Sequence, residues 1–243
     1  LGQNVNAYKS KDKRLSSLIF EIEKIPGIER IRYTTSHPKD MTEDLIETYK
    51  YSKKLMPLVH LPVQSGSDKI LSRMNRKHTI SEYIKIFNKL RDINTNIEFS
   101  SDFIVGYPGE EEKDFIETLE LIKKIKFINS YSFIFSPRPG TVAADLKLIK
   151  KKVSFIRLEI IQKLLFENQL NKNKSLENSV LNVLVENLTE NKKQVFGRSE
   201  HMTSVIFDGN KDDIGKILPV KIKKSNRSTL FGELISSSNK RVA

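Results

Sequence analysis

A glycine-rich turn inside residues 98–110 (EFSSDFIVGYPGE) is the part of this sequence that could most directly take part in chemistry. The apolar run from Phe103 to Val105 stops at Gly106, and a helical pattern opens at Glu110. A glycine lets a ligand approach the backbone closely, and the N–H groups at the start of a helix favour polar or anionic groups. An ordinary strand-to-helix loop has the same pattern, so both interpretations stay open on this stretch alone.

Polar residues also follow the other strand-like runs in the first part of the chain. Taken singly, each has an ordinary structural explanation as a helix cap, a turn residue or a solvated side chain. In α/β folds, however, the C-terminal ends of parallel strands lie at one edge, where such folds bind ligands. The sequence therefore predicts one ligand-binding mouth, formed by Gln3 and Asn4, Ser36 and His37, Gln64 and Ser65, Gly106 and Glu110, and Ser136 and Arg138.

Several kinds of chemistry find no support in these 243 residues. The sequence has no cysteine, which excludes disulfides, thiolate nucleophiles and thiolate metal ligands within it. His37, His60, His78 and His201 show no metal-binding spacing, and no pair of carboxylates suggests an acid–base couple. No apolar run approaches the length of a membrane span, so we expect a cytoplasmic protein without a membrane partner.

The elements that must position the polar residues alternate between strand and helix. Strands are expected at residues 28–35, 56–63, 98–105 and 130–136. Helical spacing of apolar residues appears between them, and a long helix is expected over about residues 150–171. This alternation predicts the α/β class, with parallel strands joined by helical crossovers.

The pattern changes after a polar segment at residues 171–178, which marks a domain boundary. The first domain is therefore expected at 1–171 and the second at 172–243. In the second, apolar and polar residues alternate in five short runs separated by polar or glycine turns: 180–185, 194–198, 204–207, 217–222 and 229–235. Five such strands predict a small, OB-like β-barrel.

Both the whole chain and its final part are basic. The chain has 42 Lys and Arg against 30 Asp and Glu, a net charge of +12, and the part from Lys172 onward has 13 against 8. Such a surplus indicates a polyanionic partner, nucleic acid first, although a compositional bias toward Lys would also raise the charge. A small basic β-barrel commonly binds nucleic acid, and the alternative is a structural appendage with Lys for solubility.

Five segments, in this order, resemble the radical-SAM methylthiotransferases: GQNVNAY (2–8), TTSHP (34–38), HLPVQSGSD (60–68), SSDFIVGYPGE (100–110) and SFIFSPRPGT (132–141). The final module, with DIGK at 213–216, resembles the TRAM RNA-binding domain that ends those enzymes. QSGSD and FSPRPGT are most similar to the branch that modifies N6-isopentenyladenosine in tRNA. The branches that act on threonylcarbamoyladenosine in tRNA or on a ribosomal protein are the alternatives.

The resemblance implies a partial (β/α)6 radical-SAM barrel that lacks its first strand, followed by a small all-β, OB-like TRAM domain. It implies S-adenosyl-L-methionine as a cofactor and two [4Fe-4S] clusters in the intact enzyme, one of them on a CxxxCxxC loop. The implied activity is methylthiolation of N6-isopentenyladenosine next to the tRNA anticodon, begun by a deoxyadenosyl radical that removes a hydrogen atom. A reductant and a sulfur donor are implied as further partners.

The resemblance also assigns residues by their positions at strand ends. The S-adenosylmethionine pocket would be formed by Gln3, Asn4, Ser36, Gln64, Ser65, Ser101, Asp102, Val105 and Gly106. The tRNA would contact Arg138 at the mouth and, in the final module, Lys192, Lys193, Arg198, Lys221, Lys223, Lys224 and Arg227. No catalytic side chain is assigned, and the role of Glu110 stays open because the common GxIxGxxE pattern is met only in part.

The sequence departs from the family at one point that matters for activity. A [4Fe-4S] cluster needs thiolate ligands, and the chain has no cysteine. We expect the cluster cysteines upstream of Leu1 in a longer protein, and we expect this chain to be inactive by itself. A non-catalytic RNA-binding protein, or the remnant of a split gene, is the alternative.

Overall fold

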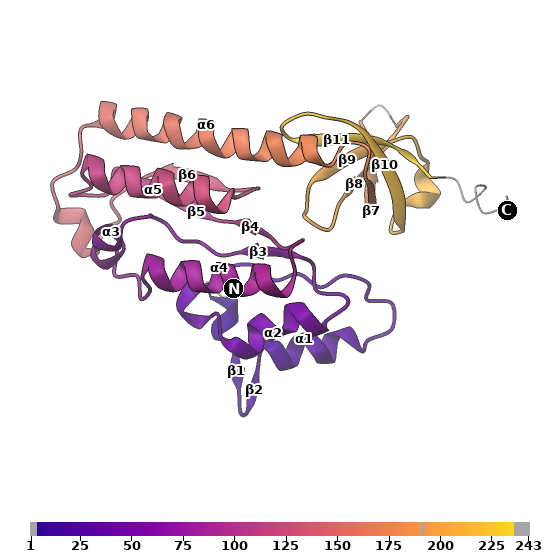
Figure 1. The fold of residues 1–243 in the computed structure, drawn as a ribbon, viewed down its shortest axis with the longest axis horizontal. Coiled ribbons are helices and arrows are strands. Elements are labelled where there is room, and N and C mark those ends of the chain that lie inside the picture. The colour runs from indigo at the N-terminus through magenta and orange to yellow at the C-terminus, as the bar shows by residue number, and fades with distance from the viewer. Residues whose placement is uncertain (1–3, 191, 236–243) are drawn as a thin grey trace. The chain divides into compact units, whose positions relative to one another are not determined.

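The computed structural model describes residues 4–190 and 192–235, and Figure 1 shows their course. The chain divides into two compact units, Leu1–Leu165 and Phe166–Ala243. Within the described residues, no helix is long and apolar enough to cross a membrane.

The first unit alternates short parallel strands with helices, after a small hairpin of β1 and β2. Its elements are β1 (Lys9–Ser10), β2 (Lys13–Arg14), α1 (Leu15–Glu23), α2 (Glu43–Tyr51), β3 (Leu58–His60), α3 (Asp68–Arg73), α4 (Ile80–Ile93), β4 (Glu98–Ser100), β5 (Asp102–Val105), α5 (Glu112–Ile125) and β6 (Tyr131–Ile134). Strand β3 pairs with β4 and β5 pairs with β6, both in parallel. A bridge between Gln64 and Phe103 joins the two pairs. The predicted α/β class is confirmed.

Fully buried side chains recur at every second position along residues 59–63 and 103–105. The fully buried set belongs to one hydrophobic core that also contains residues of the helices: Val59, Leu61, Val63, Phe103 and Val105. His60 and Asp102, which lie next to these residues in the sequence, keep part of their surface exposed, whereas Pro62 is buried. Because neighbouring residues of a strand point to opposite faces, the sheet turns one face to this core and the other carries polar side chains.

One predicted strand is wrong. Residues 28–35 alternate between apolar and polar side chains, but in the structure only Ile31 pairs, through a single bridge to Leu55. Thr35 then adopts a φ of 62°, in the left-handed region, which ends the extended backbone. Alternation alone therefore indicated which side of the segment is buried, but the segment has no neighbouring strand with which to form a ladder beyond Ile31.

The long helix α6, Lys151–Ser175, begins in the first unit and ends in the second. The sequence places it at about residues 150–171. In the first unit its buried residues, Ser154, Arg157, Ile161 and Leu165, recur every three or four positions. This spacing puts them on one face of the helix, which packs on the first unit.

The second unit is a closed barrel with the strand order β10-β11-β9-β8-β7. The strands are β7 (Val180–Leu188), β8 (Val195–Arg198), β9 (Ser204–Phe207), β10 (Ile217–Ser225) and β11 (Thr229–Leu234). Strands β9 and β11 are parallel, whereas the other neighbours are antiparallel. Its core consists of Val183, Val185, Val195, Val205, Phe207, Val220, Ile222 and Leu230. The predicted five-stranded barrel is confirmed.

Candidate functional site

The glycine turn after β5 has a backbone and surroundings that suit only glycine. Gly106 has a φ of 73°, a conformation that other residues rarely adopt. A Cβ at this position would lie 2.9 Å from Ser154 Cβ of α6 and closer still to Ser154 Oγ. The Gly106 N–H donates to Glu110 Oε2 at 2.8 Å. The turn is therefore closed by a carboxylate and covered by α6.

Glu110 is buried and paired with Arg157. Their side chains are only 1% and 8% exposed, and Arg157 Nη1 lies 2.8 Å from Glu110 Oε2. Burial raises the pKa of Glu110, while the Gly106 N–H and Arg157 act in the opposite direction. Glu110, whose role the sequence motif leaves open, thus contacts the backbone of the turn.

The chain at Val5 and Asn6 lies against the segment around Ser36 and His37. The Val5 N–H donates to Thr35 O at 2.9 Å. The side chain of Asn6 exchanges two hydrogen bonds with the backbone of His37, each 2.9 Å long. Two polar segments that the sequence assigns to one mouth are thus held together.

Two predicted pocket residues in these segments have buried oxygen atoms with no hydrogen-bond partner among the described residues. They are Oγ of Ser36, a residue that is 4% exposed, and Oδ1 of Asn4. Asn4 Nδ2 donates to Asp40 Oδ2 at 2.6 Å, which fixes its amide. A buried oxygen without a donor is the kind of atom that a polar ligand satisfies. Gln3, which was assigned to the same pocket, lies outside the described residues.

Gln64 has a strained backbone at the end of the β3 region. Its φ is 74° although it is not a glycine. Its N–H donates to Asp102 O at 3.0 Å, and its own carbonyl accepts from Ile104 N–H at 2.9 Å. Strained residues of this kind cluster at functional sites, and the strands on both sides hold Gln64 in place.

Three other predicted pocket residues have side chains committed to the interior. Ser65 Oγ lies 3.4 Å from Thr118 Oγ1, and Ser101 Oγ accepts from Val63 N–H at 2.9 Å. Val105 has no exposed surface and belongs to the core. A ligand at the mouth would therefore meet these residues through their backbone atoms.

The polar face of the sheet carries a histidine–aspartate pair that sequence spacing did not reveal. His60 Nδ1 lies 2.9 Å from Ser100 Oγ, and His60 Nε2 lies 3.8 Å from Asp102 Oδ2. Burial lowers the pKa of His60 and raises that of Asp102, and Arg76 opposes the second shift. Arg76 also donates to Pro62 O at 2.9 Å. The only signal in the sequence is that His60 and Asp102 occupy polar positions between buried ones.

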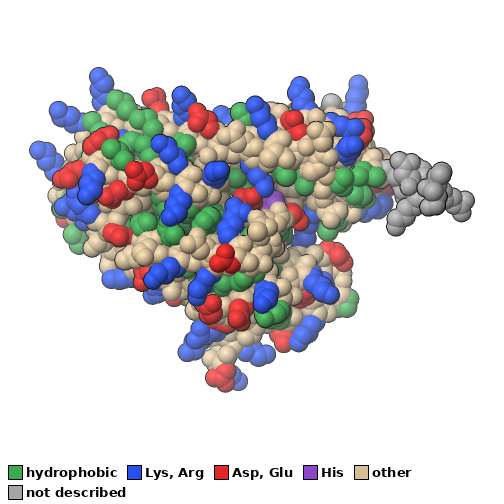
Figure 2. All heavy atoms as spheres, in the orientation of Figure 1, with side chains coloured by type: hydrophobic (Ala, Val, Ile, Leu, Met, Phe, Trp, Pro, Cys, Tyr) green, Lys and Arg blue, Asp and Glu red, His purple; other side chains and the backbone are tan. Residues whose placement is uncertain are grey.

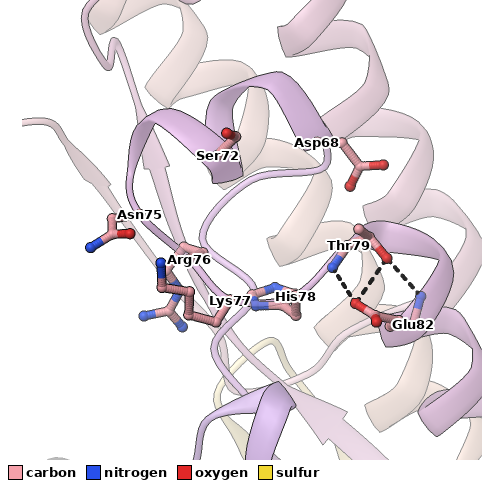
Figure 3. Close-up of a pocket in the computed structure, with 8 residues that line it drawn as sticks. All are labelled: Asp68, Ser72, Asn75, Arg76, Lys77, His78, Thr79 and Glu82. Carbon is pink, nitrogen blue, oxygen red and sulfur yellow. Dashed lines mark hydrogen bonds between the residues drawn. The ribbon is translucent and has the colours of Figure 1, made fainter.

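His78 lines a pocket of about 360 Å³ beside the segment between α3 and α4 (Figure 3). It is 7% exposed, and neither ring nitrogen has a hydrogen-bond partner in the described part of the chain. Burial and then the charge of Arg76 lower the pKa of His78 to about 4. Asp68 and Glu82, on the same pocket, accept hydrogen bonds from backbone N–H groups at the start of α4. A neutral imidazole among engaged carboxylates does not by itself identify a ligand.

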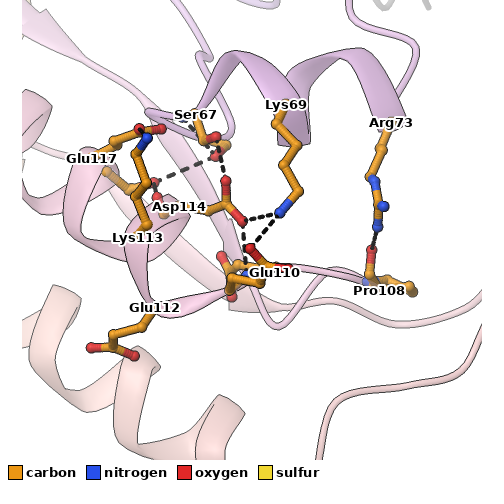
Figure 4. A network of polar contacts seen from close by, with 12 residues as sticks. Ser67, Lys69, Arg73, Pro108, Glu110, Glu112, Lys113, Asp114 and Glu117 are labelled. Carbon is orange, nitrogen blue, oxygen red and sulfur yellow. Dashed lines mark hydrogen bonds and ion pairs between the residues drawn. The ribbon is translucent and has the colours of Figure 1, made fainter.

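A second pocket, of about 500 Å³, lies over the starts of α3 and α5. Lys69 Nζ lies 3.0 Å from carboxylate oxygens of both Glu111 and Asp114, and Ser67 Oγ donates to Asp114 at 2.7 Å (Figure 4). Burial raises the pKa of Asp114, but the bonds from Glu111 N–H, Ser67 and Lys69 outweigh it and the net shift is downward. These charges satisfy one another and tie the two helix starts together.

The predicted RNA contacts of strand β10 lie on the outside of the barrel. Lys221 and Lys223 alternate with core residues along the strand, and Lys224 is exposed. Lys223 Nζ pairs with Glu233 Oε1 at 2.6 Å, which leaves Lys224 as the more available cation. Figure 2 shows that Lys and Arg side chains are spread over the visible face among acidic ones and do not form one patch.

The other predicted RNA contacts lie in turns and at strand ends. Lys192 and Lys193 are exposed between β7 and β8, and Arg138 is exposed in the loop after β6 of the first unit. The Arg198 guanidinium lies 5.1 Å from the ring centre of Phe196. Arg227 is exposed, and its guanidinium lies 4.1 Å from the ring centre of Phe166.

A row of apolar side chains crosses the outside of the barrel and was missed in the sequence. Ile206 of β9 pairs with Phe196 of β8 on one side and with Phe231 of β11 on the other. Phe231 in turn pairs with Lys224 of β10. Paired residues of neighbouring strands share a face, and all three apolar side chains are partly exposed. Aromatic rings beside cations are what stacked nucleic-acid bases require.

Comparison with known proteins agrees with this geometry. The model of the radical SAM superfamily matches residues 2–122, which contain the predicted mouth residues except Ser136 and Arg138. The TRAM domain model matches residues 174–235, which contain the barrel. The chain contains a radical SAM domain and a TRAM domain. The predicted order of a radical-SAM domain followed by a TRAM domain is confirmed.

Three curated relatives carry the name tRNA-2-methylthio-N(6)-dimethylallyladenosine synthase. The one from Pelagibacter ubique (strain HTCC1062) is 65% identical over 100% of this chain and 55% of its own length. Those from Anaplasma phagocytophilum (strain HZ) and Wolbachia pipientis wMel are 45% and 47% identical over 98% and 96% of this chain, and 56% and 54% of their own lengths. The chain thus spans about half the length of the curated relatives it matches.

The radical-SAM chain and its implied cofactors fit each other only in part. S-adenosylmethionine is a polar nucleoside ligand, and the unsatisfied oxygens of Asn4 and Ser36 suit such a molecule. An iron–sulfur cluster does not fit these 243 residues, which contain no cysteine. Among the described side chains, no group of three His, Cys, Asp or Glu residues could hold a metal ion either.

Proposed function

We propose that this chain forms one wall of the S-adenosylmethionine site and the RNA-binding module of a tRNA methylthiotransferase. The target nucleoside would be N6-isopentenyladenosine beside the anticodon. The observation that carries the proposal is the glycine turn at Gly106, set among polar strand ends in a chain that is 65% identical to a synthase named for this modification.

The mouth would hold S-adenosylmethionine through a small number of polar contacts. Asn4 and Ser36 would accept hydrogen bonds from the cofactor, and Gln64, Asp102 and the Gly106 backbone would face its nucleoside part. Ser65, Ser101 and Val105 would support this wall through their backbone, because their side chains are engaged inside the fold. When bound, the cofactor would supply the methyl group and the precursor for hydrogen abstraction.

The remaining cofactor chemistry would come from residues outside this sequence. Two [4Fe-4S] clusters, as the family implies, would need thiolates that these 243 residues lack. A reductant and a sulfur donor would be further partners, and the reaction would take place in the cytoplasm, where tRNA is modified.

The TRAM domain would bind tRNA through phosphate contacts and stacking. Lys192, Lys193, Lys221, Lys223, Lys224, Arg198 and Arg227 would contact phosphates, and Arg138 would do so at the mouth. The outer row of Phe196, Ile206 and Phe231 would stack on unpaired bases, such as those of an anticodon loop. The contribution of the cations to tRNA affinity would fall as the salt concentration rises, whereas the contribution of the apolar row would not.

The test is nucleoside analysis of tRNA by liquid chromatography and mass spectrometry. Cells that lack the gene should accumulate N6-isopentenyladenosine without the methylthio group, and the restored gene should reverse this. Loss of methylthiolation on threonylcarbamoyladenosine, or on a ribosomal protein, would assign the chain to another branch of the family. An unchanged nucleoside profile together with salt-dependent tRNA binding would favour the non-catalytic RNA-binding alternative.

A further inference from the structure

The Glu110 carboxylate connects the glycine turn of the mouth with helix α6. Its Oε2 atom accepts the Gly106 N–H at 2.8 Å and lies 2.8 Å from Arg157 Nη1. Arg157 Nη1 also donates to the Glu110 carbonyl at 3.1 Å. One guanidinium therefore fixes both the side chain and the backbone of the residue that closes the turn.

Two further contacts hold Arg157, although its buried Nε atom has no hydrogen-bond partner among the described residues. Its Nη2 atom donates to Glu112 Oε2 at 3.1 Å, at the start of α5, and its guanidinium lies 5.2 Å from the ring centre of Phe115. Three residues earlier on the same face of α6, Ser154 covers Gly106 so closely that no Cβ fits between them. Helix α6 thus touches the turn directly through Ser154 and indirectly through Glu110.

Stability alone is a poor explanation for such a pair. Taking two charges out of water has a large desolvation cost, and buried ion pairs are often no more stabilising than apolar residues of similar volume. What the pair provides is geometry, because a planar guanidinium can bridge a carboxylate and a carbonyl in only a narrow set of orientations. The group whose orientation it fixes is the Gly106 peptide, through the hydrogen bond from its N–H to Glu110.

We propose that Arg157, acting through Glu110, is a positioning residue that sets the conformation of the Gly106 turn for S-adenosylmethionine. The cofactor part of this inference rests on the proposed function. Ser154 shares the role by filling the space above the turn, so that the turn cannot move toward α6.

The sequence offers a clean spectroscopic probe of the turn. Val105–Gly106 is the one Val–Gly pair in the chain, so labelling with 13C-carbonyl valine and 15N-glycine gives a single NMR correlation, that of the Gly106 amide. Its proton should resonate far downfield in the full chain, since it is bonded to a carboxylate. Titration with S-adenosylmethionine should move the same signal.

Three variants separate positioning from general stability. Arg157→Lys keeps the positive charge but loses the planar guanidinium with its several N–H donors. Glu110→Gln keeps an oxygen acceptor on a side chain of the same shape but removes the negative charge. Arg91→Lys is the matched control, because Arg91 also pairs with a largely buried glutamate, Glu98, at 3.2 Å and lies over Phe87 and Phe99. If Arg157→Lys does not fold, Glu110→Gln carries the test alone.

The expected result is an upfield move of the Gly106 amide proton in both variants. The move should be larger in Glu110→Gln, which removes the charge of the acceptor itself, than in Arg157→Lys, which only loosens the orientation of that acceptor. The dissociation constant for S-adenosylmethionine should rise about tenfold in Arg157→Lys, the equivalent of one charge-assisted hydrogen bond. Arg91→Lys should change neither the signal nor the constant, even where it lowers the melting temperature.

Other outcomes would overturn the inference in distinguishable ways. An unmoved Gly106 signal in folded Arg157→Lys, or an unchanged dissociation constant, would contradict the positioning role alone. If Arg91→Lys changed the Gly106 signal and the dissociation constant as much as Arg157→Lys does, the effect of Arg157→Lys would be a general loosening of the fold and not positioning. A parent chain whose Gly106 signal ignores S-adenosylmethionine would contradict the proposed function and with it the cofactor role of Arg157, whatever the variants show about the turn.

Discussion

Replacing Gly106 by alanine tests how tightly α6 closes over the turn. An alanine with a φ near 73° costs about 1–2 kcal/mol in backbone strain. The new Cβ would also lie 2.9 Å from Ser154 Cβ, and overpacking of this kind costs roughly 1–3 kcal/mol. The expected loss in the free energy of unfolding is therefore about 2–5 kcal/mol.

The chain contains a matched control for the strain alone. Gly27 has a φ of 82°, but a Cβ there would meet nothing within 4 Å. Gly27→Ala should therefore cost only about 1–2 kcal/mol, and the excess in Gly106→Ala measures the collision with Ser154. The measurement is urea unfolding followed by circular dichroism at 222 nm, with equal slopes required for the comparison.

A double-mutant cycle isolates the contact. Ser154→Gly removes both atoms that the new Cβ would approach within 3 Å and costs roughly 0.5 kcal/mol in helix propensity by itself. Combined with Gly106→Ala, it should return about 1–3 kcal/mol of the loss. If the two losses simply add, or if Gly106→Ala costs no more than Gly27→Ala, α6 does not close over the turn in solution.

Three further predictions concern the other parts of the molecule. The pKa of His78 is about 4 in the folded chain against 6.5 for the free side chain, so between pH 6.5 and 4 the unfolded chain takes up a proton that the folded chain does not. The free energy of unfolding should therefore fall by about 2 kcal/mol over this range. The urea midpoint should fall less over the same range in His78→Leu. Replacing Lys192 and Lys224 by Ala should weaken tRNA binding for all sequences and flatten the salt dependence of log K by about 0.7–0.9 per lysine, as filter binding at several salt concentrations can show. Phe231→Ala should weaken binding to a single-stranded RNA loop by about 1–3 kcal/mol with little change in melting temperature. Phe207→Ala, in the core, should instead destabilise the barrel by about 3–5 kcal/mol. Equal effects of the two substitutions on the melting temperature would contradict an outer position for Phe231.

Patterns within short stretches of the sequence predicted the glycine turn, the polar strand ends and the barrel strands. The glycine turn could be predicted because a glycine after an apolar run and before an acidic helix start describes both its backbone and its place in the chain. The polar ends of the other strands followed from the α/β alternation. The five barrel strands followed from a change in hydrophobic period.

Contacts between distant residues could not be predicted in this way. Arg157 and Glu110 are 47 positions apart, and nothing near Arg157 in the sequence distinguishes it from a solvated arginine on a basic helix. His60 and Asp102 meet only because residues 58–64 run alongside residues 98–104, where His60 pairs with Ser100, two positions before Asp102. The strand expected at residues 28–35 failed for the same reason, since a strand needs a neighbouring strand and only Ile31 of this segment forms a β-bridge.

Hydrogen–deuterium exchange of the full chain with and without S-adenosylmethionine tests the central claim most directly. The structure predicts slower exchange in peptides that cover residues 34–37, 63–66 and 103–107, and no change in the barrel strands of residues 180–234. Absence of protection at these strand ends, or protection confined to the barrel, would contradict a cofactor site at the mouth of the first unit.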